Sequence, residues 1–171
     1  MMTPTDWRER VLNLPLWAVA TTVALSGALL GALLWVAVTE VPLGVLGQVE
    51  VSGRGGVLLI PLMTLLSFIK WLFDTLVLWT AARITGRIAG DPFQVGWLEG
   101  YRYMLPITML MVLNSTLSLL ISALTGLWMM LLVAWVVDLF ILRAFLEMDW
   151  YELVLLNAVL GFFSCATGGL L

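Results

Sequence analysis

The sequence predicts an all-α integral membrane protein in which five transmembrane helices form one bundle. Hydrophobic residues make up 62% of the 171 residues and charged residues only 11%, whereas a soluble domain is about 45–50% apolar and about 25% charged. The mean hydropathy is +1.07. The apolar residues fall into five stretches, each near the ~20 residues that an α-helix needs to cross a bilayer. Lipid is therefore the predicted solvent for most of the chain.

The first predicted span covers residues 16–38. Pro15 precedes it at a position where helices tolerate proline, and Asn13 can cap its amino end. The apolar run is longer than the roughly 7–15 residues of a signal-peptide core, and no Ala-x-Ala cleavage site closes it. We therefore expect this segment to stay in the protein as a helix.

The second predicted span, residues 57–82, is long enough to tilt in the bilayer. The third, residues 104–124, opens beside Pro106. Only Thr125 and Gly126 separate it from the fourth span. So short a connection predicts an antiparallel hairpin.

The fourth span covers residues 127–146 and the fifth residues 150–171. Asp149 and Glu152 begin the fifth with the spacing of a capping box. The connecting segments are too short for a soluble domain, so residues 1–171 are predicted to form a single transmembrane domain.

The arginines predict how this domain is oriented. An odd number of spans puts the two termini on opposite sides of the membrane. Six arginines then share one side, and Arg54 alone lies on the other. Because basic residues accumulate on the cytoplasmic side, the N-terminus is predicted to be cytoplasmic and the C-terminus to lie on the opposite side. The six arginines are Arg8, Arg10, Arg83, Arg87, Arg102 and Arg143.

Several classes of function are disfavoured by what the sequence lacks. It has no histidine and one cysteine, Cys165, which argues against His-ligated haem, most zinc sites and iron–sulfur clusters. It has no glycine-rich nucleotide-binding motif and no nucleophile elbow. It also has no polybasic tract that would bind nucleic acid. We expect no enzymatic activity, no cofactor, no metal site and no nucleic-acid partner.

Three charged residues inside the spans are the main candidates for a functional site. Lys70 lies near the middle of the second span, where a charge costs at least ~2.5–3.5 kcal/mol. Asp74 follows four positions later on the same helix face and can pair with it. Asp138 lies in the fourth span, which runs parallel to the second, and could face either residue. These charges could fix helix register, contact a partner subunit, or form a path for ions or protons.

Small and polar residues mark further helix faces. Small residues spaced by four let helix backbones approach closely, within the chain or with a partner. In the first span they are Ala24, Gly27, Ala28 and Gly31, and in the fifth Gly161, Cys165 and Gly169. A polar stripe of the third span, suited to hydrogen bonds between helices, contains Asn114, Ser118 and Ser122.

The segment between the second and third spans resembles the central loop of the bacterial branch of the YIP family (Ypt/Rab-interacting membrane proteins). The similarity extends to residues 12–15 (Leu-Asn-Leu-Pro), to residues 142–147 (Leu-Arg-Ala-Phe-Leu-Glu) and to the five-span layout. The matching residues of the loop are Gly90, Phe93, Gly100, Tyr101 and Pro106. The resemblance implies five helices, non-catalytic work and a bacterial inner membrane. The long N-terminal segment of the eukaryotic members is missing, which argues against GTPase binding.

The resemblance and the composition together predict an accessory, scaffold or assembly subunit for other membrane proteins and lipid, working in a larger complex. The alternative is a small transporter or channel that uses Lys70, Asp74 and Asp138.

Overall fold

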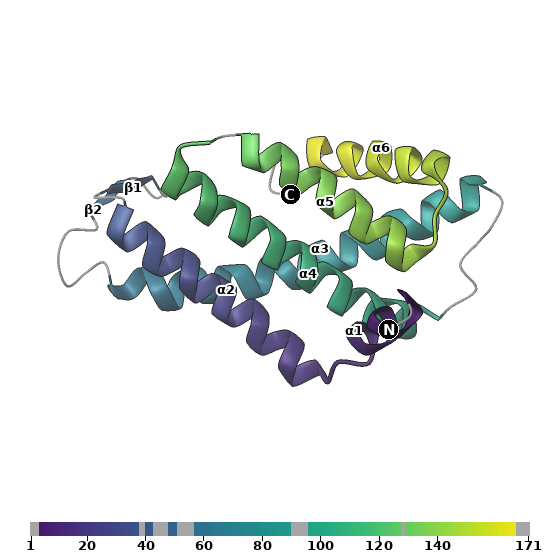
Figure 1. The fold of residues 1–171 in the computed structure, drawn as a ribbon, viewed down its shortest axis with the longest axis horizontal. Coiled ribbons are helices and arrows are strands. Elements are labelled where there is room, and N and C mark those ends of the chain that lie inside the picture. Colours follow the sequence, from purple (N-terminus) through teal and green to yellow (C-terminus); the bar gives the residue numbers. More distant parts are fainter. Residues whose placement is uncertain are drawn as a thin grey trace.

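A computed structural model gives the fold, and it describes residues 4–37, 40–42, 48–50, 57–89, 96–127 and 129–166. This part of the chain is helical apart from two short strands (Figure 1). Gly90 and Phe93, which carry part of the family resemblance, lie outside the described residues. The elements are α1 (Pro4–Leu12), α2 (Leu16–Ala37), β1 (Glu40–Pro42), β2 (Gln48–Glu50), α3 (Leu59–Ala89), α4 (Trp97–Thr125), α5 (Met129–Leu146) and α6 (Trp150–Ala166).

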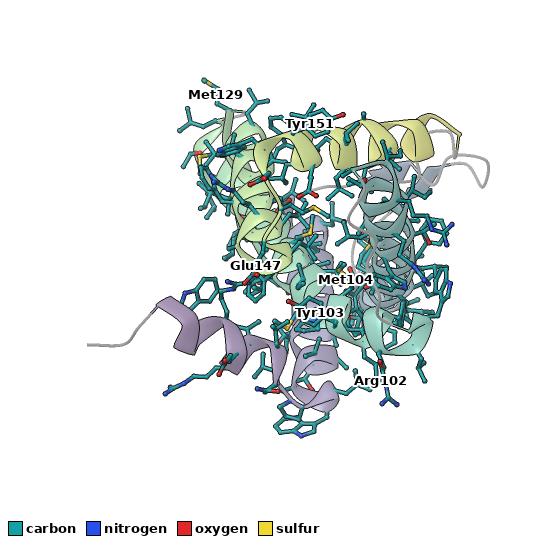
Figure 2. The ribbon with its side chains drawn as sticks, turned by 90° about the vertical axis from the view of Figure 1, so that its right-hand side faces the viewer. Arg102, Tyr103, Met104, Met129, Glu147 and Tyr151 are labelled. Atoms are coloured by element: carbon teal, nitrogen blue, oxygen red, sulfur yellow. The ribbon has the colours of Figure 1, made fainter. Side chains whose placement is uncertain are left out.

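The long helices pack side by side (Figure 1). Helix α2 lies against α3 and α4, α3 also contacts α4 and α6, and α5 contacts α4 and α6. Strands β1 and β2 pair antiparallel with Val41 opposite Val49. In the view of Figure 2, α6 is seen lengthwise along one side of the bundle. Helix α1 lies on the opposite side of that view.

Local sequence signals account for several helix ends. Helix α1 stops before Pro15, as expected because a proline disfavours helical geometry in the residue before it. Helix α4 ends at Gly126, whose φ of 71° is left-handed and whose N–H bonds the Ser122 carbonyl at 2.8 Å. The Glu152 carboxylate accepts the Asp149 N–H at 2.9 Å, which confirms the predicted capping contact at α6.

Two helices are longer than the spans that hydropathy predicted. Helix α3 continues to Ala89 and α4 begins at Trp97, whereas the predicted spans were 57–82 and 104–124. Pro106 therefore lies inside α4 instead of beside its start. Hydropathy detects the part of a helix that suits hydrocarbon, and these helices continue beyond it with polar residues. Helix α1 was not predicted for the same reason, because its composition is polar.

In the described part of the chain, three helices are long and apolar enough to cross a membrane: Leu16–Val36, Leu59–Ala89 and Trp97–Thr125. The described part of α6, Trp150–Gly161, is apolar but shorter. The protein is therefore a helical protein with the composition and helix lengths of a membrane protein.

Two hydrophobic clusters hold the helices together. One joins α3, α4, α5 and α6 around Trp79, Met104 and Phe145. The other joins α2, α3 and α4 around Val23 and Trp71.

Two polar contacts add to the packing between α3 and α4. The indole N–H of Trp71 donates to the Leu105 carbonyl at 3.2 Å. The buried hydroxyls of Thr75 and Thr108 lie 2.7 Å apart. The α3–α4 contact is thus closely packed along one side of α3.

Candidate functional site

The small-residue face of α2 is used inside the chain. Gly27 and Gly31 are buried against α3, whereas Ala24 and Ala28 are half-buried. A Cβ atom on Gly27 would lie 2.8 Å from Ser67, and one on Gly31 would lie 2.7 Å from the Ile60 backbone. Such separations leave no room for a side chain. The predicted face therefore packs α2 on α3.

The small-residue face of α6 has a different environment. A Cβ atom on Gly161 would meet no atom within 4 Å, because this glycine lines a cavity. Cys165 belongs to α6, but its side chain lies outside the described part of the structure, as does Gly169. The same spacing of small residues therefore occurs on α2, where the glycines pack against a helix, and on α6, where Gly161 faces open space.

One residue of the polar stripe of α4, Asn114, makes two hydrogen bonds to another helix. The Asn114 amide donates at 2.8 Å to the Asp138 carboxylate and at 2.8 Å to the Ala134 carbonyl, both on α5. Ser118 is buried, and the Ser122 carbonyl accepts the Gly126 N–H. Asn114 therefore ties α4 to α5 and holds the carboxylate of Asp138 in place.

Lys70 and Asp74 form the predicted ion pair along α3. The ammonium nitrogen lies 3.0 and 3.1 Å from the two carboxylate oxygens. Over half of the Lys70 side chain is exposed (54%), against 26% for Asp74. The protein therefore covers this ammonium group only in part, and hydrocarbon would not solvate the remainder.

Lys70, Asp74 and Asp138 line one cavity of about 770 Å³. Its walls come mainly from α3, α4, α5 and α6, with Leu30 from α2. Within the described residues, no ion pair joins Asp138 to Lys70. The sequence left open whether Asp138 faces Lys70 or Asp74, and the structure places all three residues on the wall of one cavity. The partner of Asp138 is Asn114 of α4.

Several polar groups of the cavity wall lack protein partners. Asp138 accepts only the Asn114 amide in the described part of the chain. The Asn157 amide nitrogen bonds the Leu153 carbonyl at 2.9 Å, which leaves the amide oxygen without a donor among the described residues. The hydroxyl of Ser115 likewise has no bond there. Polar groups without protein partners are costly to withdraw from water, so water or a bound molecule is needed to satisfy them.

Sequence reasoning did not single out Asn157, Ser115 or Trp135 as members of this site. Each lines the cavity. Asn157 carried a usable signal, because it is an amide inside an otherwise apolar predicted span. Trp135 carried none, since a tryptophan inside a span is more often a packing residue.

A second polar region lies away from the cavity. It is formed by the carboxyl-terminal ends of α3 and α5, by α1 and by the start of α4. Arg8 pairs with Glu147 at 3.0 Å and donates to the Phe145 carbonyl at 3.4 Å. The Tyr103 hydroxyl donates to that same carbonyl at 2.8 Å. Figure 2 shows Tyr103 and Glu147 between α1 and the end of α5, whereas Arg102 points away from the bundle.

Tryptophans accompany the arginines at this end. The Arg83 guanidinium lies 5.5 and 5.6 Å from the ring centres of Trp79 and Trp97. The Arg143 guanidinium lies 4.2 Å from the ring centre of Trp150. Arginine on tryptophan at helix ends is typical of a membrane–water interface.

The cavity wall combines charged, polar and apolar groups. In the described part of the chain, no three His, Cys, Asp or Glu residues come together in a group that could hold a metal ion. The cavity offers two carboxylates, one ammonium group, hydroxyls and amides within mainly apolar walls. Such a surface can hold a molecule that has both a polar and an apolar part.

Comparison with known proteins adds no relative. The chain matches no protein-family model, and it matches no curated protein and no solved structure.

Proposed function

We propose that the protein spans the membrane five times, with α2 to α6 as its spans and the N-terminus in the cytoplasm. The support is the clustering of basic residues at one end of the bundle. Arg8 contacts the turn between α5 and α6, and Arg83 contacts the start of α4. Arg143 lies at the end of α5. A single basic end is what the cytoplasmic side of a membrane protein carries.

A pair of fusions tests this topology. A reporter that works only in the cytoplasm is expected to be active before Met1 and inactive after Leu171. Equal activity at both positions would contradict an odd number of spans.

We further propose that the protein is a non-catalytic accessory protein of the membrane, and that it holds a small molecule in the cavity between α3, α4, α5 and α6. One observation supports this proposal above the others. Lys70, Asp74 and Asp138, the three most costly residues of the predicted spans, all line the same cavity. Its volume of about 770 Å³ lies within the ~300–1,000 Å³ range of small-molecule sites.

The resemblance to the bacterial branch of the YIP family favours the same kind of role. It implies non-catalytic work in a bacterial inner membrane, alongside other integral membrane proteins and lipid in a larger complex. The tight packing of α2 on α3 removes Gly27 and Gly31 from the candidate partner surfaces. A partner of the accessory protein would then meet other faces of the bundle.

Gly161 provides a direct test of the binding role, because a side chain there would enter the cavity without meeting other atoms. Native mass spectrometry of the protein purified gently from its membrane is expected to show a bound small molecule. Gly161→Leu is expected to lose it about ten-fold or more, whereas Gly161→Ala should retain it. Equal occupancy in the wild type and Gly161→Leu would refute the binding role.

Transport is the second candidate, and the shared cavity of Lys70, Asp74 and Asp138 favours it. If the charges carry ions or protons, Lys70→Met with Asp74→Leu should abolish flux into vesicles that contain the purified protein. A proton-sensitive dye inside the vesicles reports that flux. Glu147→Gln, outside the cavity, is the matched control and should leave the flux unchanged.

A further inference from the structure

The charges of the cavity wall do not balance. Its ionisable residues in the described chain are Lys70, Asp74 and Asp138. Lys70 and Asp74 neutralise each other at 3.0 Å. Asp138 is held by a neutral amide alone. The wall therefore carries one uncompensated negative charge, and the occupant that complements it is a cation.

The hydrogen-bonding groups of the wall that lack partners also favour a cation as the occupant. The second carboxylate oxygen of Asp138 and the amide oxygen of Asn157 are acceptors without donors in the described chain. The Ser115 hydroxyl can accept as well. An occupant that brings several N–H donors satisfies these groups, and an ammonium group brings three.

Most of the remaining wall is apolar, although Ser67, Thr108 and Thr116 also line it, and this argues for an organic cation over a metal ion. Calcium and magnesium take six or more oxygen ligands in a small shell, whereas this cavity measures about 770 Å³ and its wall presents mainly apolar surface. The ring of Trp135 lies one helical turn before Asp138 on α5 and also lines the cavity. A tryptophan and a carboxylate that line the same cavity favour an ammonium group as its occupant.

We propose that the cavity binds a lipophilic amine, a protonated primary amine on an apolar body, with its ammonium group against Asp138 and its apolar part against the aliphatic wall. The inference rests on the proposed binding function and names the class of molecule that is bound. An anionic ligand is disfavoured because Lys70, the only cation of the described wall, is already paired with Asp74.

Three eight-carbon probes with different head groups test this assignment: octylamine, octanol and octanoate at neutral pH. The protein is held in lipid nanodiscs, and each probe is titrated while the unfolding temperature is followed, because a ligand that binds the folded state raises it. Octylamine is expected to give the largest shift, octanol a smaller one and octanoate none. Asp138→Asn keeps the side-chain volume and is expected to weaken octylamine binding about ten-fold or more.

A second variant is the control for Asp138→Asn. Glu147→Gln removes a carboxylate that lies outside the cavity, so octylamine binding should survive. Loss of binding in this variant but not in Asp138→Asn would overturn the assignment to Asp138. A preference for octanoate, or equal shifts from the three probes, would overturn the amine class.

A different experimental result would refute the proposed small-molecule binding function itself. If the amine class alone is wrong, some probe or co-purifying small molecule still distinguishes the wild type from Gly161→Leu. If no compound distinguishes these two proteins, the cavity is not a binding site and both proposals fall. A protein partner that is lost from Gly161→Leu in place of a small molecule would show that a helix fills the cavity, and it would also overturn the amine.

Discussion

Two glycine-containing helix faces of this protein share a sequence pattern and differ in structure. On α2, Gly27 and Gly31 let α3 approach so closely that a single added carbon would overlap it. On α6, Gly161 borders a cavity of about 770 Å³ and has no atom within 4 Å of its Cβ position. The small-residue pattern thus permits close approach without requiring it. What decides the outcome is the facing helix.

The facing surfaces explain this difference. Opposite α2, helix α3 presents Thr64 and Ser67, which are small and leave room for the α2 backbone. Opposite α6, helix α3 presents the ion pair of Lys70 and Asp74. An ion pair requires polar surroundings, and the cavity supplies space for them. One helix, α3, therefore has a closely packed side and an open charged side.

The largest expected effect comes from filling the closely packed side. Gly31→Leu or Gly27→Leu forces α2 away from α3, and overpacking of this kind costs at least about 1–3 kcal/mol. We expect much less folded protein by size-exclusion chromatography and a lower unfolding temperature. Gly161→Leu is the matched control, because the same residue type enters open space. Equal losses at all three positions would mean that the two faces do not differ as described.

The small-residue spacing of the closely packed side could be predicted from the sequence, but whether that face packs within the chain or on a partner could not. Gly27 and Gly31 recur at spacing four in an apolar span, and that spacing is a property of one helix. The pairing of Lys70 with Asp74 was equally local, since i and i+4 share a helix face. The cavity depends on how α4, α5 and α6 are placed around α3, which no single helix encodes.

Residues that act across helices were accordingly harder to foresee. The contact of Asn114 with Asp138 joins positions 24 apart, and the contact of Arg8 with Glu147 joins positions 139 apart. Helix lengths were misjudged where polar residues prolong α3 and α4 beyond the apolar spans. Hydropathy locates what lipid can solvate, and a helix ends only where its backbone geometry or capping changes.

An intermediate effect is expected on the open side, at the ion pair. Lys70→Met leaves Asp74 without its cation beside the cavity, which should lower the yield of folded protein. The loss should be smaller than for Gly31→Leu, because the Lys70 side chain is 54% exposed and part of the charge is solvated. Adding Asp74→Leu should recover much of the yield. A double variant no better than the worse single one would show that the two residues do not act as a pair.

The smallest expected effect comes from adding one methyl group on each of the two glycine-containing faces. It tests the difference between these faces most directly, because nothing else changes. Gly→Ala inside a helix favours the helix by about 0.8–1.0 kcal/mol when the added methyl group meets nothing. At Gly161 the methyl group enters open space, so Gly161→Ala should raise the unfolding temperature slightly. At Gly27 it would lie 2.8 Å from Ser67, so Gly27→Ala should lower that temperature despite the same gain in helix propensity. The two alanine variants are measured together in nanodiscs of one lipid composition, so that only the environment of the methyl group differs. Shifts of the unfolding temperature in the same direction would mean that the gain in helix propensity outweighs the contact between α2 and α3. Ser67 would then be able to move away from the added methyl group.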